Sequence, residues 1–442
     1  MATLMTAALR DDIDHVEQKL YRRVAWRIMP IAVICLIFSH FDRINISFAK
    51  TQMQADLGLS DTAYGVAASI FFLGYVLFEV PSGIGLRKYG APAWICRVMV
   101  TWGLATAALM FASNEWLLYG LRFLIGVMEA GFAPAIMVYL CMWFPRRKLA
   151  QINGLFFLAV PLAGALGAPV SGLILQAMDG VMGLAGWHWL FLITGLPCSI
   201  WGIVVLYRFD RTIEAATWLE DEEKKTLMAN LQADLKPGKP VLSSMWKVLL
   251  TREVLLLALI YFTMKTAAYG INFWMPNLIA KSGAHTPLST GLLSALPYAI
   301  ACIAMLFVTR YSDRTGDRKT VLWVCMTAAA IGFLLSCFFF DNTLVLIIAL
   351  MLTCMGTFIA VPVFWTVPQS VFSGMGLVTA IAAINSAGQI SGLVAPILVG
   401  WLNDLSGTSY MGMLAIAPVC MLSVYLVISY VPSARTLVRA TN

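Results

Sequence analysis

The segment TWLEDEEKK at residues 217–225 lies within a hydrophilic stretch at 208–247, the only long one in the sequence. A segment rich in proline, glycine and lysine follows at 236–240. On both sides of this stretch, long apolar runs alternate with short polar breaks, and each run has the length of about 20 residues that a helix needs to cross a bilayer. The stretch therefore divides the sequence into two halves, each with six expected spans.

The apolar runs define the expected membrane spans and the domain boundaries. The spans are expected near residues 24–48, 61–86, 92–112, 115–140, 149–177, 187–207, 253–280, 288–310, 320–340, 342–367, 374–401 and 409–432. The expected domains are an N-terminal segment (1–23), an N-terminal six-helix bundle (24–207), a central loop (208–252), a C-terminal six-helix bundle (253–432) and a tail (433–442). The expected fold class is thus an all-α membrane protein with twelve transmembrane helices in two bundles.

The composition agrees with a membrane protein and excludes several other classes. Of the 442 residues, 60% are hydrophobic and 12% are charged, whereas a soluble domain is about 25% charged. The net charge of +7 does not indicate nucleic-acid binding, because the basic residues are dispersed through loops at the membrane edges and form no patch with interleaved aromatics. The nine cysteines show no CxxC pair, so we expect small packing residues.

The distribution of Lys and Arg over the loops predicts the orientation in the membrane. One set of connections, to which both termini belong, carries most of them: Arg87, Lys88, Arg146, Arg147, Lys148, Arg310, Arg314, Arg318, Lys319 and the basic residues of the central loop. The opposite set holds only Lys50 and Lys281. By the positive-inside rule the basic side is cytoplasmic. We therefore expect a multi-pass protein of the plasma membrane, the bacterial inner membrane, with both termini in the cytoplasm.

A weak internal repeat relates the two halves. GIGLRKYG at 83–90 corresponds to RYSDRTG at 310–316, and DRINISFA at 42–49 overlays AYGINFWM at 268–275 at the same offset along the chain. The small-residue helices ALGAPVSG at 165–172 and GLVAPILVG at 392–400 are related by nearly the same offset. Such a repeat predicts a transporter fold whose substrate site lies near the bilayer midplane between the halves.

Charged side chains inside spans are costly and mark functional sites. Five qualify away from the helix ends: Asp42, Arg43, Arg122, Glu129 and Lys265. Arg122 and Glu129 are two helical turns apart, so they face the same direction about 10 Å apart. We expect Asp42 to pair with Arg122, which leaves Arg43 free for a substrate carboxylate. Glu129 is the expected proton carrier, and the alternative is a static ion network of the four N-terminal charges.

Polar and aromatic residues of the second half extend the candidate binding site. Lys265, Tyr269 and Asn272 share one face of a helix, and Lys265 is expected either to receive a second carboxylate or to titrate. Asn385 and Gln389 are one turn apart and face substrate or a neighbouring helix. Trp365 and Thr366, next to Phe364, are candidates to stack on a planar ligand or to pack.

Two further groups have two interpretations each, and a third has one. Phe71, Phe72 and Tyr75 are either packing residues or ligand contacts. His40 lies close to Asp42 and is either a proton shuttle or a satisfied core histidine. His188, between two tryptophans, is typical of an aromatic belt at a membrane interface.

Two basic turns, GIGLRKYG and SDRTGDRK, together with the two halves, resemble the Major Facilitator Superfamily. Within it, the chain resembles the anion:cation symporter family, closest to its bacterial tartrate, phthalate and hydroxyphenylacetate permease branch. The matching segments are FDRINISFA at 41–49, FFLGYVLFEVPS at 71–82, RFLIGVMEAGFAPA at 122–135 and WHWLFLITG at 187–195. Two positions depart from the pattern: Arg87 stands where Asp is usual, and Phe41 where some sugar-acid members carry Tyr.

The resemblance implies roles for single residues. Arg43 matches the substrate-carboxylate arginine, Asp42 and Glu129 match the acidic coupling residues, Arg122 matches the arginine paired with the first-span acid, and Asn385 matches a polar substrate contact. Lys265 has no counterpart in the general family pattern, so its expected role rests on its position alone.

These features predict a proton-coupled importer of a small organic carboxylate, working by alternating access. If Arg43 and Lys265 both face the central site, they would clamp a dicarboxylate. The alternative is an organic anion exchanger or uniporter without proton coupling. An enzyme or a sensor is not expected, because no catalytic, nucleotide-binding or metal-binding pattern and no large hydrophilic domain occurs. We expect no cofactor, no metal and no nucleic acid; the expected partners are substrate, protons and lipid around a monomer.

Overall fold

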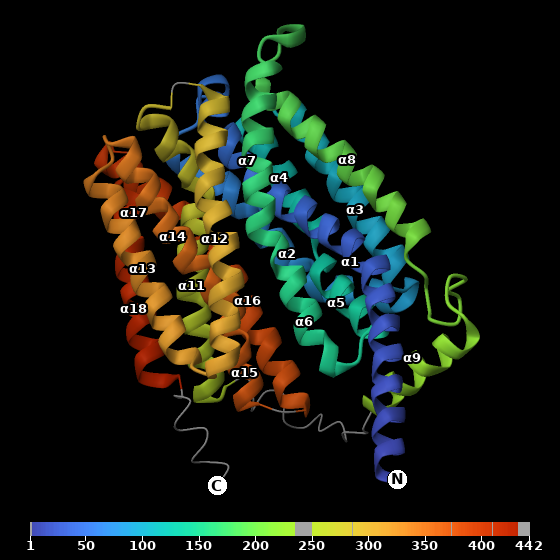
Figure 1. Cartoon of the computed structure of the whole chain (residues 1–442). Coiled ribbons are helices and arrows are strands. Elements are labelled where there is room, and N and C mark those ends of the chain that lie inside the picture. The colour runs from blue at the N-terminus through green and yellow to red at the C-terminus, as the bar shows by residue number, and fades with distance from the viewer. Residues whose placement is uncertain (1, 235–249, 285, 373, 409, 432–442) are drawn as a thin grey trace.

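The structure, a computed structural model, describes residues 2–431 except 235–249, 285, 373 and 409. Every regular element in these residues is a helix, and twelve helical segments are long and apolar enough to cross a membrane. The expected all-α fold with twelve spans is therefore confirmed. Figure 1 shows the two bundles side by side, the first coloured blue to green and the second yellow to red.

The first bundle and the central segment contain elements α1 to α9. Their bounds are α1 Ala2–Leu57, α2 Asp61–Tyr89, α3 Ala91–Ala108, η1 Leu109–Phe111, α4 Glu115–Glu129, α5 Phe132–Trp143, α6 Arg146–Phe157, α7 Ala159–Ala177, η2 Val181–Gly183, α8 Gly186–Arg208 and α9 Asp221–Asp234. Helix α9 lies in the stretch that the sequence predicts to be a loop. Glu223 of α9 forms an ion pair of 2.9 Å with Arg23 of α1, which ties the central segment to the first helix.

The second bundle contains elements α11 to α18. Their bounds are α11 Arg252–Lys281, α12 Pro287–Thr315, α13 Arg318–Phe338, α14 Thr343–Phe364, α15 Thr366–Val371, α16 Gly374–Ser406, α17 Met411–Leu414 and α18 Ile416–Tyr430. Helix α1 begins, and α18 ends, on the same side of the molecule as α9 (Figure 1). We name this side the terminal face and the other side the opposite face.

One break inside a span positions a functional candidate. The fourth span is divided into α4 and α5 at Gly131, whose φ of 84° is left-handed. A Cβ at Gly131 would clash with the hydroxyl oxygen of Ser82, so both the backbone angle and the close contact require glycine. Glu129 is the last residue of α4 and thus lies at a helix end within the span.

The two bundles meet through small residues. A Cβ at Gly65 of α2 would clash with the carbonyl oxygen of Pro396 of α16. A Cβ at Gly291 of α12 would clash with the carbonyl oxygen of Ala168 of α7. Glycine at these positions lets the backbones approach closely, as is common between membrane helices. These contacts close the interface on the side of the opposite face.

Candidate functional site

An ion pair between α1 and α4 forms the centre of the candidate site. Nη2 of Arg43 lies 2.6 Å from Oε1 of Glu129, and Nε of Arg43 donates to the same oxygen at 2.9 Å. The hydroxyl of Ser39 donates to this oxygen as well, at 2.8 Å. The second carboxylate oxygen, Oε2, is buried without a hydrogen-bond partner. Glu129 therefore has one fully used oxygen and one free oxygen.

Aromatic rings hold the guanidinium of Arg43 in place. Its central carbon lies 5.2 Å from the ring centre of Phe71 and 5.1 Å from that of Tyr75, both on α2. Cation–π contacts of this kind are stronger where water is excluded. The Arg43 side chain is 16% exposed while that of Glu129 is completely buried, so Arg43 is the member of the pair that a ligand can reach.

Asp42 does not pair with Arg122 in this structure, contrary to the sequence-based expectation. Oδ2 of Asp42 accepts a hydrogen bond of 2.8 Å from the hydroxyl of Thr106 on α3, and Oδ1 accepts one of 3.2 Å from the amide of Asn45. Adjacent helical residues point about 100° apart, so Asp42 faces α3 while Arg43 faces α4. The partner of Glu129 is therefore Arg43, although the sequence predicts that Arg43 is free for substrate.

Arg122 is a buried cation with unused donors. Its Nε donates to the carbonyl of Ala67 at 3.2 Å, but Nη1 and Nη2 have no hydrogen-bond partner. None of the ion pairs among the described residues includes Arg122. Its guanidinium carbon lies 5.3 Å from the ring centre of Phe71, the ring that Arg43 also contacts.

In the second bundle, Lys265 and Tyr269 of α11 form one polar group with Gln389 of α16. Nζ of Lys265 lies 4.3 Å from the ring centre of Tyr269. The hydroxyl of Tyr269 donates to Oε1 of Gln389 at 3.0 Å. Asn385, one turn before Gln389, is half-buried on the same helix. Lys265, Tyr269 and Gln389 thus lie together, and Asn385 lies one helical turn from Gln389.

The remaining candidates of the second bundle are held by neighbouring groups. Asn272 points away toward α12, where its Oδ1 accepts a hydrogen bond of 2.9 Å from Tyr298. The hydroxyl of Thr366 donates to the carbonyl of Val363 in its own chain segment. Trp365 packs on Tyr261, with ring centres 4.9 Å apart. Their proposed contact with substrate remains a prediction.

The aromatic rings around the Arg43–Glu129 pair contact the group of Lys265, Tyr269 and Gln389 at the interface between the bundles. Phe72 of α2 lies 4.6 Å, measured between ring centres, from Tyr269 of α11. His40, on α1 with Arg43, has a buried Nε2 without a hydrogen-bond partner, which disagrees with the alternative of a satisfied core histidine. Phe71, which contacts Arg43, lies 5.1 Å from Phe72, so ring contacts connect the Arg43–Glu129 pair with Tyr269 and Lys265.

A polar cluster on the opposite face escaped the sequence analysis. Asp404, near the end of α16, accepts hydrogen bonds from the backbone N–H groups of Asp61 and Thr62 at 3.0 and 2.7 Å. It thereby caps the first turn of α2 in the other bundle. The fully buried Lys50 lies 2.8 Å from Oδ1 of Asp61 and 4.0 Å from the ring centre of Trp274. We name Asp61, Thr62 and Asp404 the latch.

The latch belongs to the closed side of the interface. Among the described residues, the hydrogen bonds that join the two bundles lie near the opposite face. They connect Asp61 and Thr62 with Asp404, Asn403 with Asp61, Tyr64 with Phe273, and Leu288 with Gln176. The described hydrogen bonds therefore hold the two bundles together on the side of the opposite face.

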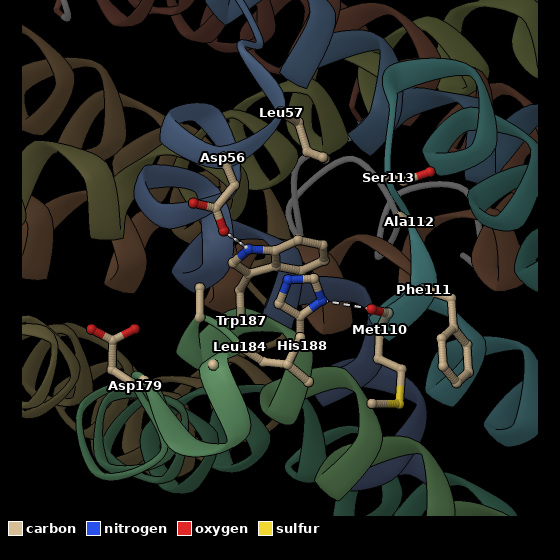
Figure 2. Close-up of a pocket in the computed structure, with 13 residues that line it drawn as sticks. Asp56, Leu57, Met110, Phe111, Ala112, Ser113, Asp179, Leu184, Trp187 and His188 are labelled. Carbon is tan, nitrogen blue, oxygen red and sulfur yellow. Dashed lines mark hydrogen bonds between the residues drawn. The ribbon is translucent and has the colours of Figure 1, made fainter.

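Figure 2 shows a pocket of about 680 Å³ on the opposite face, whose lining includes none of the central-site residues. Its polar groups are used in local structure. Asp56 accepts a hydrogen bond of 2.6 Å from the indole of Trp187, and His188 donates to the carbonyl of Met110. Asp179 accepts from the backbone of Gly186 at 3.0 Å. These bonds hold the ends of α1, η1 and α8 together and leave no free charged group for a ligand.

Comparisons with known proteins agree on one family. The model of the Major Facilitator Superfamily matches residues 32–396. The protein named "Putative metabolite transport protein NicT" of Pseudomonas putida is 37% identical over 95% of this chain and 96% of its own length. A protein of Agrobacterium vitis named "Putative tartrate transporter" is 38% identical over 93% of this chain and 91% of its own.

Solved structures share the fold at low sequence identity. A bacterial homologue of the human lysosomal transporter Spinster, in an inward-facing and occupied conformation, has a TM-score of 0.71 at 14% identity and covers 94% of this chain and 98% of its own. The xylose transporter XylE of Escherichia coli, in a partially occluded inward-open conformation, has a TM-score of 0.72 at 11% identity, covering 92% and 99%.

Proposed function

Because the chain belongs to the Major Facilitator Superfamily, we propose that it imports a small organic carboxylate together with protons by alternating access. The family and the names of the relatives make it a membrane transporter of small organic acids and not an enzyme. The proton coupling, the import direction and the roles of the site residues are the proposed part. The observation that carries the proposal is the Arg43–Glu129 pair at the interface between the bundles.

The pair supports coupling because substrate and Glu129 compete for one cation. While Glu129 is ionised, it occupies Nε and Nη2 of Arg43, the two nitrogens that suit a bidentate contact with a carboxylate. A proton on Glu129 removes its charge and frees Arg43. The substrate carboxylate then takes the place of the Glu129 charge, so proton and substrate bind together and leave together.

Because Arg43 is largely buried, protonation of Glu129 is favourable only when substrate binds to Arg43 as well. Arg43 without an anion would be an uncompensated charge within the membrane, which costs at least about 2.5 kcal/mol at the centre of a helix. Protonation of Glu129 alone creates such a charge, and substrate binding neutralises it. Asp42 lies one residue away and is held by Thr106 and Asn45, and we assign it the second proton-coupling role.

We place the terminal face in the cytoplasm of a bacterium, because the basic loops lie on that face. The latch then closes the outer face of the transporter, and the structure corresponds to an inward-facing state. Outward opening requires Asp404 of α16 to leave the first turn of α2. The small-residue contacts at Gly65 and Gly291 separate in the same step.

Replacing Asp404 with alanine is expected to shift the protein toward the outward-open state. The change removes the charge-assisted hydrogen bonds to Asp61 and Thr62, each worth about 1.5 to 3 kcal/mol. A cysteine at Ser69, which is buried on the α2 face that also carries Gly65, reports the change. In a background without the native cysteines, a membrane-impermeant maleimide should label it at least about tenfold faster from outside.

The matched control is Asn342→Ala. Asn342 caps α14 on the same face through Val345, within one bundle, so its loss should leave labelling unchanged. Equal labelling rates in the Asp404→Ala variant and the unmodified background would contradict the latch.

Uptake by energised membrane vesicles tests the proposed function. An inward proton gradient should drive accumulation of a radiolabelled organic acid above its outside concentration, and an uncoupler should abolish it. Uptake that equilibrates but ignores the proton gradient would instead support the exchanger or uniporter.

A further inference from the structure

We propose that the substrate is a small dicarboxylate, with one carboxylate bound by Arg43 of the first bundle and the other by Lys265 of the second. This inference rests on the proposed function, because it names the ligand of the same site. It assigns a role to Lys265, a cation that the proton-coupling scheme does not use.

The first argument is that the two cations lie at the same depth on helices that pack together. Arg43 lies about four helical turns before the end of α1 at Leu57, and Lys265 lies between four and five turns before the end of α11 at Lys281. At a rise of about 1.5 Å per residue these positions are about 21 Å and about 24 Å from the ends of their helices. Helices α1 and α11 contact each other across the interface.

The second argument is that one cluster of aromatic rings joins the two cations. The guanidinium carbon of Arg43 lies 5.2 Å from the ring centre of Phe71, and the ring centres of Phe71 and Phe72 are 5.1 Å apart. Phe72 lies 4.6 Å from Tyr269, whose ring centre is 4.3 Å from Nζ of Lys265. The two cations therefore contact the same aromatic cluster at the interface between the bundles.

The third argument is that Lys265 has no anion of its own. None of the ion pairs that the structure describes includes Lys265. Its side chain is half-buried in the middle of a membrane helix, where Lys residues pair with an anion or mark a substrate path. A second substrate carboxylate supplies the missing partner.

Binding of matched acids to the purified protein tests the proposal. The probes are four pairs of related acids that differ by one carboxylate: succinate and butyrate, tartrate and threonate, phthalate and benzoate, quinolinate and nicotinate. Apparent Kd values come from ligand-dependent shifts of Tm in the wild type, Lys265→Met and Lys265→Arg. For at least one pair, the dicarboxylate should bind the wild type at least about tenfold tighter than its partner.

We call the binding of one substrate carboxylate by Arg43 and of the other by Lys265 the clamp. Variants of Lys265 test whether this residue binds the second carboxylate. Lys265→Met should weaken dicarboxylate binding at least about tenfold and change monocarboxylate binding less than about threefold. Lys265→Arg keeps the positive charge, so it should retain dicarboxylate binding. Such a result would also show that the position tolerates substitution. Arg97→Gln removes an exposed cation from α3 and should change neither class.

Each remaining outcome contradicts a defined part of the scheme. Equal losses for both classes in Lys265→Met, or tighter binding of monocarboxylates by the wild type, would overturn the clamp and leave the proposed function standing. If none of the eight acids binds the wild type, the proposed function fails and the clamp fails with it.

Discussion

Replacing Arg43 with alanine is expected to lower the affinity for the carboxylate substrate by a hundredfold or more and to abolish uptake. Arg43 is the only cation of the site that is bound to the proposed proton carrier in the residues the structure describes. Removal of one partner of a buried, hydrogen-bonded charge pair costs about 2 to 5 kcal/mol, and each 1.4 kcal/mol is about tenfold in affinity. Ligand-dependent shifts of Tm and initial uptake rates in liposomes measure the two effects.

Two controls separate binding from folding in this experiment. Arg43→Lys keeps the charge but loses the planar, bidentate geometry, so it should retain some binding and little transport. Arg97→Gln removes a cation from the exposed surface of α3 and should behave as the wild type. Uptake by Arg43→Ala at a rate near that of the wild type would exclude Arg43 as the substrate cation.

Replacing Glu129 with glutamine is expected to separate transport from the proton gradient. The amide has nearly the same shape but cannot take up or release a proton, and it leaves Arg43 permanently free for substrate. Substrate exchange across the membrane should therefore persist, while accumulation against a gradient should be lost. Counterflow and proton-driven uptake, measured in the same liposomes, distinguish these two activities.

The same substitution should remove the pH dependence of substrate binding. In the wild type, Glu129 reoccupies Arg43 when it ionises, so substrate affinity should fall as the pH rises. In Glu129→Gln the affinity should stay at its low-pH value. Glu115→Gln, which alters a carboxylate in the first turn of the same helix, should retain the wild-type dependence. An unchanged pH profile in Glu129→Gln would assign the coupling proton to another group.

The long apolar runs made the twelve spans and the two bundles predictable from the sequence. A run of about 20 apolar residues has one low-energy structure in lipid, a helix that satisfies its own backbone. The same reasoning identified the charges at Asp42, Arg43, Arg122, Glu129 and Lys265, because charges within such runs are rare. The structure joins Arg43 to Glu129 and links Arg43 to Lys265 through aromatic rings, and the roles of these residues in transport stay predictions.

Helix periodicity could not predict which charges pair. It gives the angle between Asp42 and Arg43 but not the position of α3 and α4 around α1. The break at Gly131 also lies outside a periodic pattern, and it places Glu129 at the end of α4. Both the arrangement of α3 and α4 around α1 and the break at Gly131 depend on tertiary packing. Helix periodicity therefore could not predict that Glu129 pairs with Arg43 or that Asp42 does not pair with Arg122.

The latch escaped prediction for a different reason. Asp61 and Asp404 lie at helix ends, where a carboxylate is normally an exposed group near the membrane surface. Their relation depends on α2 and α16 approaching through Gly65 and Pro396. Asn272 shows the same limit, since it shares a helical face with Lys265 in the sequence but bonds Tyr298 of the neighbouring helix.

The most direct test of proton symport is the movement of protons that substrate itself causes. Purified protein is reconstituted into liposomes that contain a pH-sensitive dye, with equal pH on both sides and no membrane potential. Addition of the acid that raises Tm most should acidify the interior, with no such change in protein-free liposomes or in the Glu129→Gln variant. Entry of the radiolabelled acid without acidification would contradict symport, and with it the coupling role of the Arg43–Glu129 pair.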